Sequence, residues 1–174
     1  MTPVPELPAE LAGEVVRLRP TVAADGPALR AIHDHEAVAH WWDQPAPGFP
    51  MEDEPDAARL TIWVGDRIAG LIEFHEELEP KYRSAGIDIF VAPDLHGRGI
   101  GTEAVRLVLR HLHEERGHHR VTIDPAADNH AAIACYRKAG FTAVGRMRLA
   151  ERDSDGRGWH DALLMEHVID PGRG

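Results

Sequence analysis

Apolar and polar positions alternate along the first part of the chain in a pattern that predicts short strands joined by tight turns. Residues 14–19 alternate between the two classes and predict a first, edge strand. Residues 60–64 and 68–74 are apolar runs separated by a Gly-Asp pair, which favours a β-hairpin. Residues 21–35 carry apolar side chains at helical spacing, so a helix is expected between the first strand and the hairpin.

The middle of the chain predicts a strand, a glycine-rich turn and a long helix. Residues 87–91 are β-branched or aromatic apart from one carboxylate, Asp88, and predict a central strand. Glycines follow at 97, 99 and 101, and residues 99–116 then carry apolar side chains at helical spacing. Gly117 is expected to end this helix. Its expected buried stripe consists of Ile100, Ala104, Leu107, Val108 and Leu112.

The last third of the chain predicts a strand, a short helix and two more strands. Residues 120–124 are rich in β-branched side chains, as strands are. Residues 131–139 predict a helix that ends at a glycine. Residues 141–149 and 162–168 predict the two closing strands, joined by a charged, glycine-containing loop.

Composition and charge limit the possible functions. The 174 residues suffice for one domain, and residues 14–170 are expected to form it after a loose arm, residues 1–13, which contains three prolines. The net charge of −10 argues against a nucleic-acid partner, because the nucleic-acid backbone binds basic surfaces. The same charge suits a cationic substrate, and it also suits solubility alone.

The sequence shows neither a membrane-spanning segment nor a secretion signal, which favours a cytoplasmic protein. Apolar runs stay well short of the roughly 20 residues of a membrane span, and the N-terminus lacks a secretion signal. The single cysteine, Cys135, excludes an internal disulfide, fits a reducing compartment and is expected to pack in the core. We therefore expect a cytoplasmic monomer or homodimer with no membrane partner. Histidines at 111, 113, 118 and 119 cluster without cysteine ligands, which favours a solvated face over a metal site.

The glycine turn is the first candidate for chemistry. Glycines between a strand and a helix let backbone N–H groups point at an anion, and the helix dipole adds to the attraction. The turn lacks the ending of a P-loop and the spacing of a dinucleotide fingerprint, so alone it indicates only an anion at a helix start. The residues expected to hold a pyrophosphate are His96, Gly97, Arg98, Gly99, Ile100, Gly101 and Thr102.

A second motif lies about thirty residues later, within residues 124–141. It has the pattern Asn129-x-x-Ala132-x-x-x-Tyr136-x-Lys138-x-Gly140-Phe141. Together with the glycine turn it resembles the GNAT superfamily of acetyl-CoA-dependent N-acetyltransferases, in element order over nearly the whole chain. The resemblance implies an α/β fold, with a mixed sheet of six to seven strands flanked by helices on both faces. It also implies acetyl-CoA as co-substrate and no metal.

Within that superfamily the chain looks most like aminoglycoside 6′-N-acetyltransferases. In those enzymes the counterpart of Asp88 is proposed as the base, and the counterpart of Asp124 contacts the drug. Two segments depart from the pattern. His96 stands where the family's turn usually has Gln or Arg, and residues 157–165 look more like GNAT enzymes that act on protein N-termini. The segments that carry the resemblance are 40–42, 76–80, 86–88 and 122–125.

The resemblance implies roles for particular residues in acetyl transfer. Asp88 would take a proton from the ammonium group, directly or through water, or would bind and orient that group. A backbone N–H of the central strand would polarise the thioester oxygen, and Tyr136 would protonate the departing thiolate. The residues alone leave open an edge carboxylate for Asp88, helix packing for Tyr136 and a simple helix cap for Asn129. The expected cofactor contacts beyond the turn are Ile89, Phe90, Val91, Asn129, Ala132 and Tyr136.

The acceptor is expected to meet tryptophan and carboxylate side chains. Two adjacent tryptophans cannot both face one core from a regular element, so at least one is expected to border a groove. Aromatic faces and carboxylates together suit a cationic amine. The acidic run at 73–79 is either a negative rim or a solvated strand end. The expected acceptor residues are Trp41, Trp42, Asp43, Glu76, Glu77, Glu79, Asp88 and Asp124.

The expected function is acetyl transfer from acetyl-CoA to a primary amine of a small polycation, by direct attack without an acetyl-enzyme. The 6′-amine of an aminoglycoside is the first choice of acceptor, which would confer antibiotic resistance. The first alternative is a transferase for protein N-termini or lysines. The second belongs to another class, a non-catalytic sensor that binds acyl-CoA.

Overall fold

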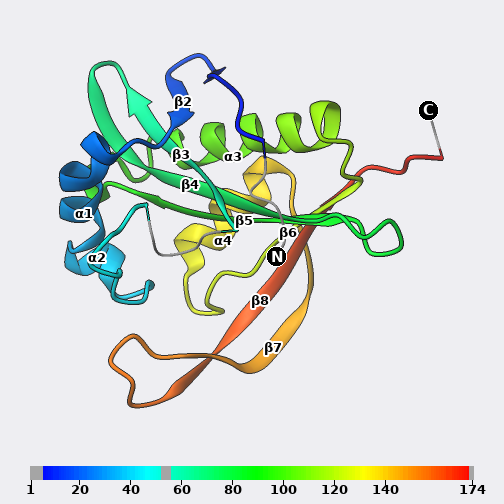
Figure 1. The fold of residues 1–174 in the computed structure, drawn as a ribbon. Coiled ribbons are helices and arrows are strands. Elements are labelled where there is room, and N and C mark those ends of the chain that lie inside the picture. Colours follow the sequence, from blue (N-terminus) through cyan, green and yellow to red (C-terminus); the bar gives the residue numbers. More distant parts are fainter. Residues whose placement is uncertain (1–5, 52–55, 173–174) are drawn as a thin grey trace.

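The computed structural model describes residues 6–51 and 56–172, and its centre is one eight-stranded sheet (Figure 1). The strand order is β1-β2-β3-β4-β5-β6-β8-β7. Neighbouring strands are antiparallel, except for the parallel pair β5 and β6. The strands are β1 Leu11–Ala12, β2 Val16–Pro20, β3 Ala58–Val64, β4 Arg67–Glu77, β5 Ser84–Val91, β6 Arg120–Ile123, β7 Thr142–Arg152 and β8 Trp159–Val168.

The sheet is flanked by helices, as the sequence predicts, but it has eight strands rather than six or seven. The additional strand is β1, in the segment expected to be a loose arm, where Leu11 pairs with Leu18 of β2. The α-helices are α1 Gly26–His33, α2 Glu36–Ala39, α3 Ile100–Arg110 and α4 His130–Ala139. Short 3₁₀ turns span Ala23–Asp25 and Pro93–Leu95, and a π-helical turn, His111–Glu115, continues α3.

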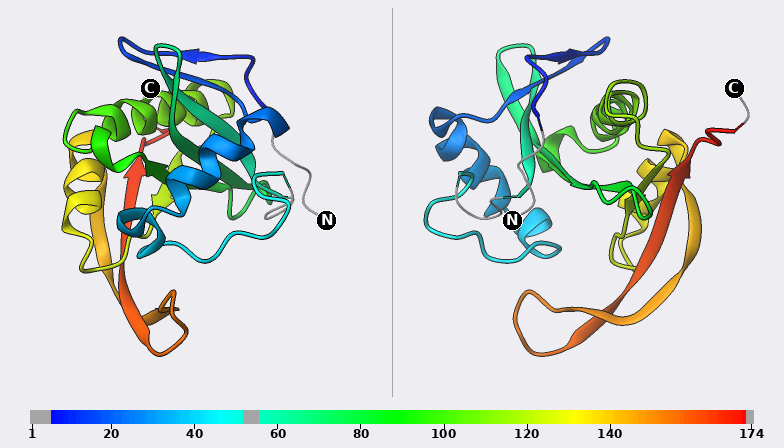
Figure 2. Two further views of the ribbon diagram at one scale, coloured as in Figure 1. Left: turned by 90° about the vertical axis from the view of Figure 1, so that its left-hand side faces the viewer. Right: turned by 45° about the vertical axis from the view of Figure 1, so that its right-hand side comes forward.

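Side chains alternate between the two faces of the central strands and divide the core in two. Ile72 and Phe74 of β4 belong to the larger cluster with α3 and α4. Leu71 and Phe90 belong to a smaller cluster with α1 and α2. Figure 2 shows these two pairs of helices on opposite sides of the sheet. By strand alternation, Asp88 shares the α1–α2 side with Phe90.

The parallel pair of β5 and β6 is short. Its registered pairs are Ala85–Val121 and Gly86–Thr122, whereas β5 continues to Val91. On its other edge β6 pairs with β8, and the chain leaves β6 through a proline-containing turn. One edge of β5 beyond these pairs therefore borders an opening instead of a strand, so its backbone groups can meet a ligand.

The two helices predicted around the glycine turn and the later motif are confirmed. All five residues of the predicted stripe on α3 are buried. Gly117, with a φ of 71°, follows the π-helical turn and ends the helix. Asn129 caps α4, because its side-chain oxygen accepts the N–H of Ala132 at 3.2 Å. Gly140 ends α4 with a φ of 108°.

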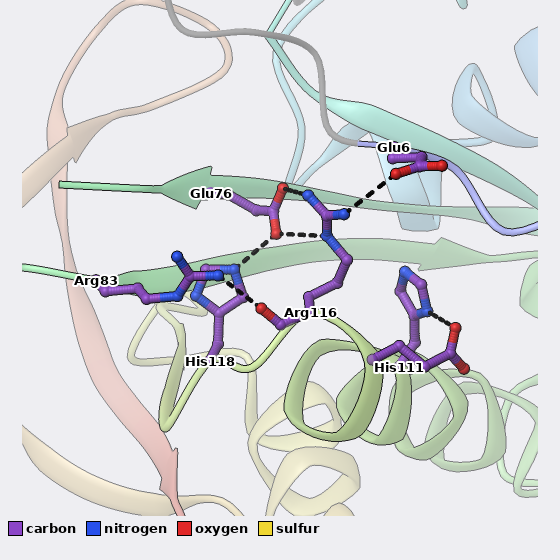
Figure 3. A network of polar contacts seen from close by, with 7 residues as sticks. Glu6, Glu76, Arg83, His111, Arg116 and His118 are labelled. Atoms are coloured by element: carbon purple, nitrogen blue, oxygen red, sulfur yellow. Dashed lines mark hydrogen bonds and ion pairs between the residues drawn. The ribbon is translucent and has the colours of Figure 1, made fainter. Parts of the chain in front are cut away.

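Glu76 ties the end of β4 to the end of the α3 segment through a buried ionic network (Figure 3). Its carboxylate accepts hydrogen bonds from the Arg116 guanidinium at 3.0 and 3.1 Å. Oε1 of Glu76 lies 2.6 Å from Nε2 of His118, and these two side chains are 2% and 0% exposed. Burial raises the pKa of Glu76, but the hydrogen bonds from Arg116 and His118 outweigh it and hold the pKa below the ordinary value. Burial lowers the pKa of His118, so a neutral imidazole donates to an ionised carboxylate.

The substitution Glu76→Gln should lower the free energy of unfolding by about 2–3 kcal/mol. It removes the anionic partner of Arg116 and His118 at a buried position. Urea unfolding followed by circular dichroism measures the change. The exposed neighbour Glu77 supplies the control, since Glu77→Gln should change stability by less than about 0.5 kcal/mol. Equal effects of the two variants would show that the network does not stabilise the fold.

Stability should also fall with acidification through the same groups. The pKa values of Glu76 and His118 lie below their ordinary values of 4.5 and 6.5 in the folded chain. Each group therefore stabilises the fold above its ordinary pKa, and that stability is lost as the pH falls through the folded pKa. Unfolding at several pH values below about 4.5, where the Glu76 contribution is lost, should show a decline that is shallower for Glu76→Gln than for the unchanged chain. Parallel curves would contradict this account.

Candidate active site

A cavity of about 1750 Å³ opens beside the unpaired edge of β5. Its walls come from α2 and the loop after it, the central strands, the glycine turn, α3, α4 and the base of the β7–β8 tip. Most of the predicted site residues meet there. Those that line the cavity are Trp41, Trp42, Asp43, Asp88, Ile89, Phe90, Val91, His96, Gly97, Arg98, Gly99, Ile100, Gly101, Thr102, Asp124, Asn129, Ala132 and Tyr136.

The glycine turn forms one end of this cavity, which we call the cofactor end. Gly97 and Gly99 have φ values of 74° and 81°, a left-handed conformation that glycine adopts without strain. Gly99 is the N-cap residue of α3. Because glycine has no side chain, it offers no side-chain acceptor to the first N–H groups of the helix. Nε2 of His96 lies 2.7 Å from the carbonyl oxygen of Val91. His96, which stands where the family usually has Gln or Arg, therefore links the turn to β5.

Helices α3 and α4 approach each other closely beside the turn. A Cβ atom on Gly101 would lie 3.3 Å from Sγ of Cys135, closer than an ordinary van der Waals contact. The same sulfur lies 3.3 Å from Oγ1 of Thr102, and burial raises the pKa of the thiol. Cys135 packs against the main core, as predicted, and it also lines the cavity, which the sequence pattern did not indicate.

Four basic side chains on the glycine turn, α3 and α4 line the cavity although the chain as a whole carries a charge of −10. The residues are Arg98, Arg106, Arg110 and Lys138. Sequence analysis singled out Arg98 as part of the turn but missed Arg106 and Arg110. Their four-residue spacing on α3, which places both on one helix face, was the available signal. The N-terminus of α3, which has no side-chain cap, and these cations together fit a phosphate-bearing ligand such as coenzyme A.

Three groups that could handle protons converge where β5 and β6 separate. Asp88 lies on β5, Asp124 follows β6 and Tyr136 lies on α4, and all three line the cavity. Tyr136 is 7% exposed. Burial raises the pKa of its phenol, and the charges of Cys135, Asp88 and Asp124 raise it further. Burial also raises the pKa of Asp124. The phenol therefore stays protonated and can act as a donor.

The tryptophan pair borders the opposite end of the cavity, which we call the acceptor end. The rings of Trp42 and Phe90 meet edge to face at 5.2 Å, so Trp42 extends the small cluster below α1 and α2. The Trp41 ring meets His40 at 4.4 Å. Both tryptophans line the cavity and both are half-buried, in agreement with the prediction that at least one borders a groove.

The acidic run is not part of the site in the way expected. Glu76, Glu77 and Glu79 do not line the cavity. Glu76 points instead to Arg116 and His118, because β4 extends to Glu77 and Glu76 shares the α3 side with Ile72 and Phe74. Glu77 and Glu79 are exposed and bonded to each other through the Glu77 carboxylate.

Residues that were not among the expected acceptor contacts complete the acceptor end, although Glu73 belongs to the acidic run at 73–79. Arg59, Glu73 and Phe49 line it. So does Glu151 at the base of the β7–β8 tip, whose carboxylate lies 3.3 Å from Nε2 of His160. The hairpin register could have revealed Glu73, since pairing residues 68–74 with the central strand brings it opposite Asp88.

The long β7–β8 hairpin reaches across to the acceptor end (Figure 1). Oγ of Ser154 lies 3.4 Å from the carbonyl oxygen of His40, which joins the hairpin tip to the loop after α2. Within residues 6–51 and 56–172, no group of three or more His, Cys, Asp or Glu is arranged to hold a metal ion. In the same part of the chain, no helix is both long and apolar enough to cross a membrane.

Comparison with known proteins agrees with this geometry. The model of the acetyltransferase (GNAT) family matches residues 24–141. A spermidine N(1)-acetyltransferase of Escherichia coli K12 is 26% identical over 144 residues, which cover 76% of this chain and 75% of that protein.

Solved structures share the fold. A ribosomal-protein alpha-N-acetyltransferase, solved in complex with coenzyme A, is 22% identical, has a TM-score of 0.76 and covers 92% of this chain and 98% of its own. The structure of AAC(6′)-Ib with paromomycin and acetyl-CoA is also 22% identical, with a TM-score of 0.72 and coverage of 89% and 94%. At this level of identity the likeness concerns the fold alone.

The substitution Gly99→Ala should weaken the binding of coenzyme A about fivefold or more. Alanine in the left-handed conformation costs about 1–2 kcal/mol, and relief of that strain would rotate the N–H groups of the turn. Isothermal titration calorimetry with coenzyme A measures the effect. Gly145, on β7 and outside the cavity, is the matched control, and Gly145→Ala should bind as the unchanged chain does. Equal affinities for all three proteins would exclude this turn as the phosphate site.

Proposed function

This chain belongs to the acetyltransferase (GNAT) family, and from that premise we propose that it acetylates a primary amine of a small cationic molecule. The acetyl-CoA-dependent N-acetyltransferase activity follows from the family and from its named relatives. The observation that carries the choice of acceptor is the charge at the acceptor end. Asp43, Asp88, Asp124 and Glu151 all line that end of the cavity, and together they attract a cation.

Bound acetyl-CoA supplies an activated acetyl thioester, and the residues of the cavity do the rest. The glycine turn, Arg98, Arg106 and Lys138 would hold its phosphates. The open edge of β5 offers backbone N–H groups at Ile89 to Val91, and one of them would hydrogen-bond the thioester oxygen as negative charge develops on it. Asn129, which also caps α4, would meet the pantetheine arm.

Proton transfer would involve Asp88 and Tyr136. An ammonium group has a pKa of roughly 10 and must lose a proton before its nitrogen can attack. Asp88 would bind that ammonium and pass the proton on, directly or through water. The neutral amine then attacks the thioester carbon, and the nitrogen releases its second surplus proton to solvent through Asp88 or water. The C–S bond breaks, the Tyr136 phenol gives the departing thiolate its proton, and Tyr136 regains a proton from solvent. The raised pKa of Tyr136 keeps the phenol protonated until that moment, and it also makes the phenol a weaker acid toward the thiolate.

Polyamines and aminoglycosides are the acceptors that this site fits best. The Escherichia coli relative is a spermidine acetyltransferase, and the neighbour with paromomycin shares the fold. Half-buried Trp41 and Trp42 beside Asp43 would stack on the apolar faces of such a molecule while carboxylates bind its charges. An aminoglycoside acceptor would make the protein a resistance enzyme.

A protein N-terminus is the second candidate acceptor. It is favoured by the shared fold of the ribosomal-protein acetyltransferase. An N-terminal α-amine carries one positive charge, whereas a polyamine carries several. The carboxylates of the acceptor end should therefore attract a polyamine more strongly than a peptide N-terminus.

A thiol-release assay with acetyl-CoA separates these candidates. We expect the highest kcat/KM with spermidine or with aminoglycosides that bear a 6′-amine, about tenfold or more above short peptides with free N-termini. Turnover on peptides, with none on any polyamine or aminoglycoside, would overturn the proposed acceptor class. Binding of acetyl-CoA without release on any amine would instead support a non-catalytic sensor.

The substitutions Asp88→Asn and Tyr136→Phe should each lower amine-dependent kcat by about 10²-fold or more, since each removes a proton-transferring group. Calorimetry should show acetyl-CoA affinity within about twofold of the unchanged chain. Tyr82 is exposed and outside the cavity, so Tyr82→Phe is the matched control for the phenol. Unchanged release by both site variants would remove Asp88 and Tyr136 from the mechanism.

A further inference from the structure

A row of charged side chains crosses the floor of the acceptor end. Arg59 on β3 pairs in register with Glu73 on β4, and Glu73 pairs in register with Asp88 on β5. Residues directly opposite one another on adjacent strands point to the same face of the sheet. All three residues line the cavity, so the row forms part of its wall.

Arg59 holds Glu73 in place. Nε of Arg59 donates to Oε2 of Glu73 at 2.8 Å, and its NH1 group donates to the carbonyl oxygen of Pro50 at 2.9 Å. The side chains of Arg59 and Glu73 are only 9% and 8% exposed. A buried guanidinium with both ends bonded has little freedom, and it fixes the carboxylate that it binds. Glu73 is therefore pre-organised before any acceptor arrives.

Acidic groups outnumber basic groups in the row. Cβ atoms of directly opposed residues lie about 4.5–5.5 Å apart, so Glu73 and Asp88 are side-chain neighbours on one face of the sheet. The row therefore contains one guanidinium and two carboxyl groups. A single ammonium group at the two carboxylates would bring the row to neutrality, which an uncharged hydroxyl or amide would not do.

We propose that Glu73 is a specificity-determining residue, which contacts the acceptor ammonium together with Asp88. The proposal rests on the proposed function and names the group that selects a protonated primary amine. After Asp88 has taken one proton, the amine still has two N–H bonds, and Glu73 accepts one of them. Because Arg59 fixes Glu73, that hydrogen bond orients the nitrogen lone pair away from the sheet floor.

The competing role for Glu73 is structural, as the counter-ion of a buried arginine. Removing Glu73 alone would then harm the protein only because Arg59 is left unpaired. Removing both charges restores electrostatic balance in that case, whereas it does not restore a lost contact to the acceptor. The pair of variants Glu73→Gln and Arg59→Gln/Glu73→Gln distinguishes the two roles.

Steady-state kinetics with the best amine of the panel provides the test. Glu73→Gln should raise the KM for the amine about 10- to 100-fold, the usual range for losing a hydrogen bond to a charged group, with KM for acetyl-CoA unchanged within about twofold. The double variant should keep an amine KM at least about tenfold above the unchanged chain. Asp66 lies in the exposed β3–β4 turn, and Asp66→Asn should leave both KM values unchanged.

Two results would overturn the proposal. One is an amine KM for Glu73→Gln equal to that of the unchanged chain, and the other is recovery of the original amine KM in the double variant. If Glu73→Gln fails to fold, the double variant decides alone, because it leaves no unpaired buried charge. Failure of the proposed function has a different sign: the unchanged chain would release no thiol from acetyl-CoA with any amine. That result would overturn both the proposed function and the role of Glu73.

Discussion

The early separation of β5 from β6 is the constraint on which the rest of the structure depends. Backbone N–H and C=O groups inside a sheet normally pair with a neighbouring strand, and leaving them without partners costs free energy. Here the registered pairing stops at Gly86 and Thr122, and the cavity occupies the space beyond. The open edge of β5, Asp88 and Tyr136 share that space. Continued pairing would remove the backbone donors and the cavity at once.

Local patterns predicted the part of the site that is built from contiguous sequence. The strand at residues 87–91, the glycine turn and the helix after it were all predictable, because periodicity and glycine placement act over a few residues. The cap at Asn129 was predictable for the same reason. The two-residue strand β1 was not, because it is too short to show any period and forms only by pairing with β2.

The alternation of side chains along β4 explains why Glu76 lies outside the cavity and why Glu73 lines it. Glu73 and Glu76 lie three residues apart on β4, so they point to opposite faces of the sheet. Glu76 enters the network with Arg116 and His118, and Glu73 enters the cavity wall. A count of carboxylates along the sequence treats the two as equivalent. They differ because β4 extends to Glu77 and so includes both residues, and this length is decided by pairing with neighbouring strands.

The two ends of the cavity are encoded by separate stretches of the chain. The cofactor end draws on the turn at 96–102 and on α3 and α4, whereas the acceptor end draws on the loop after α2, on β3 and β4, and on the β7–β8 tip. Mutations can therefore accumulate in one set without disturbing the other. A lineage built on this plan can explore new amines by drift in its outer segments while the acetyl donor stays the same. A change of acceptor would then require substitutions only in the segments that line the acceptor end.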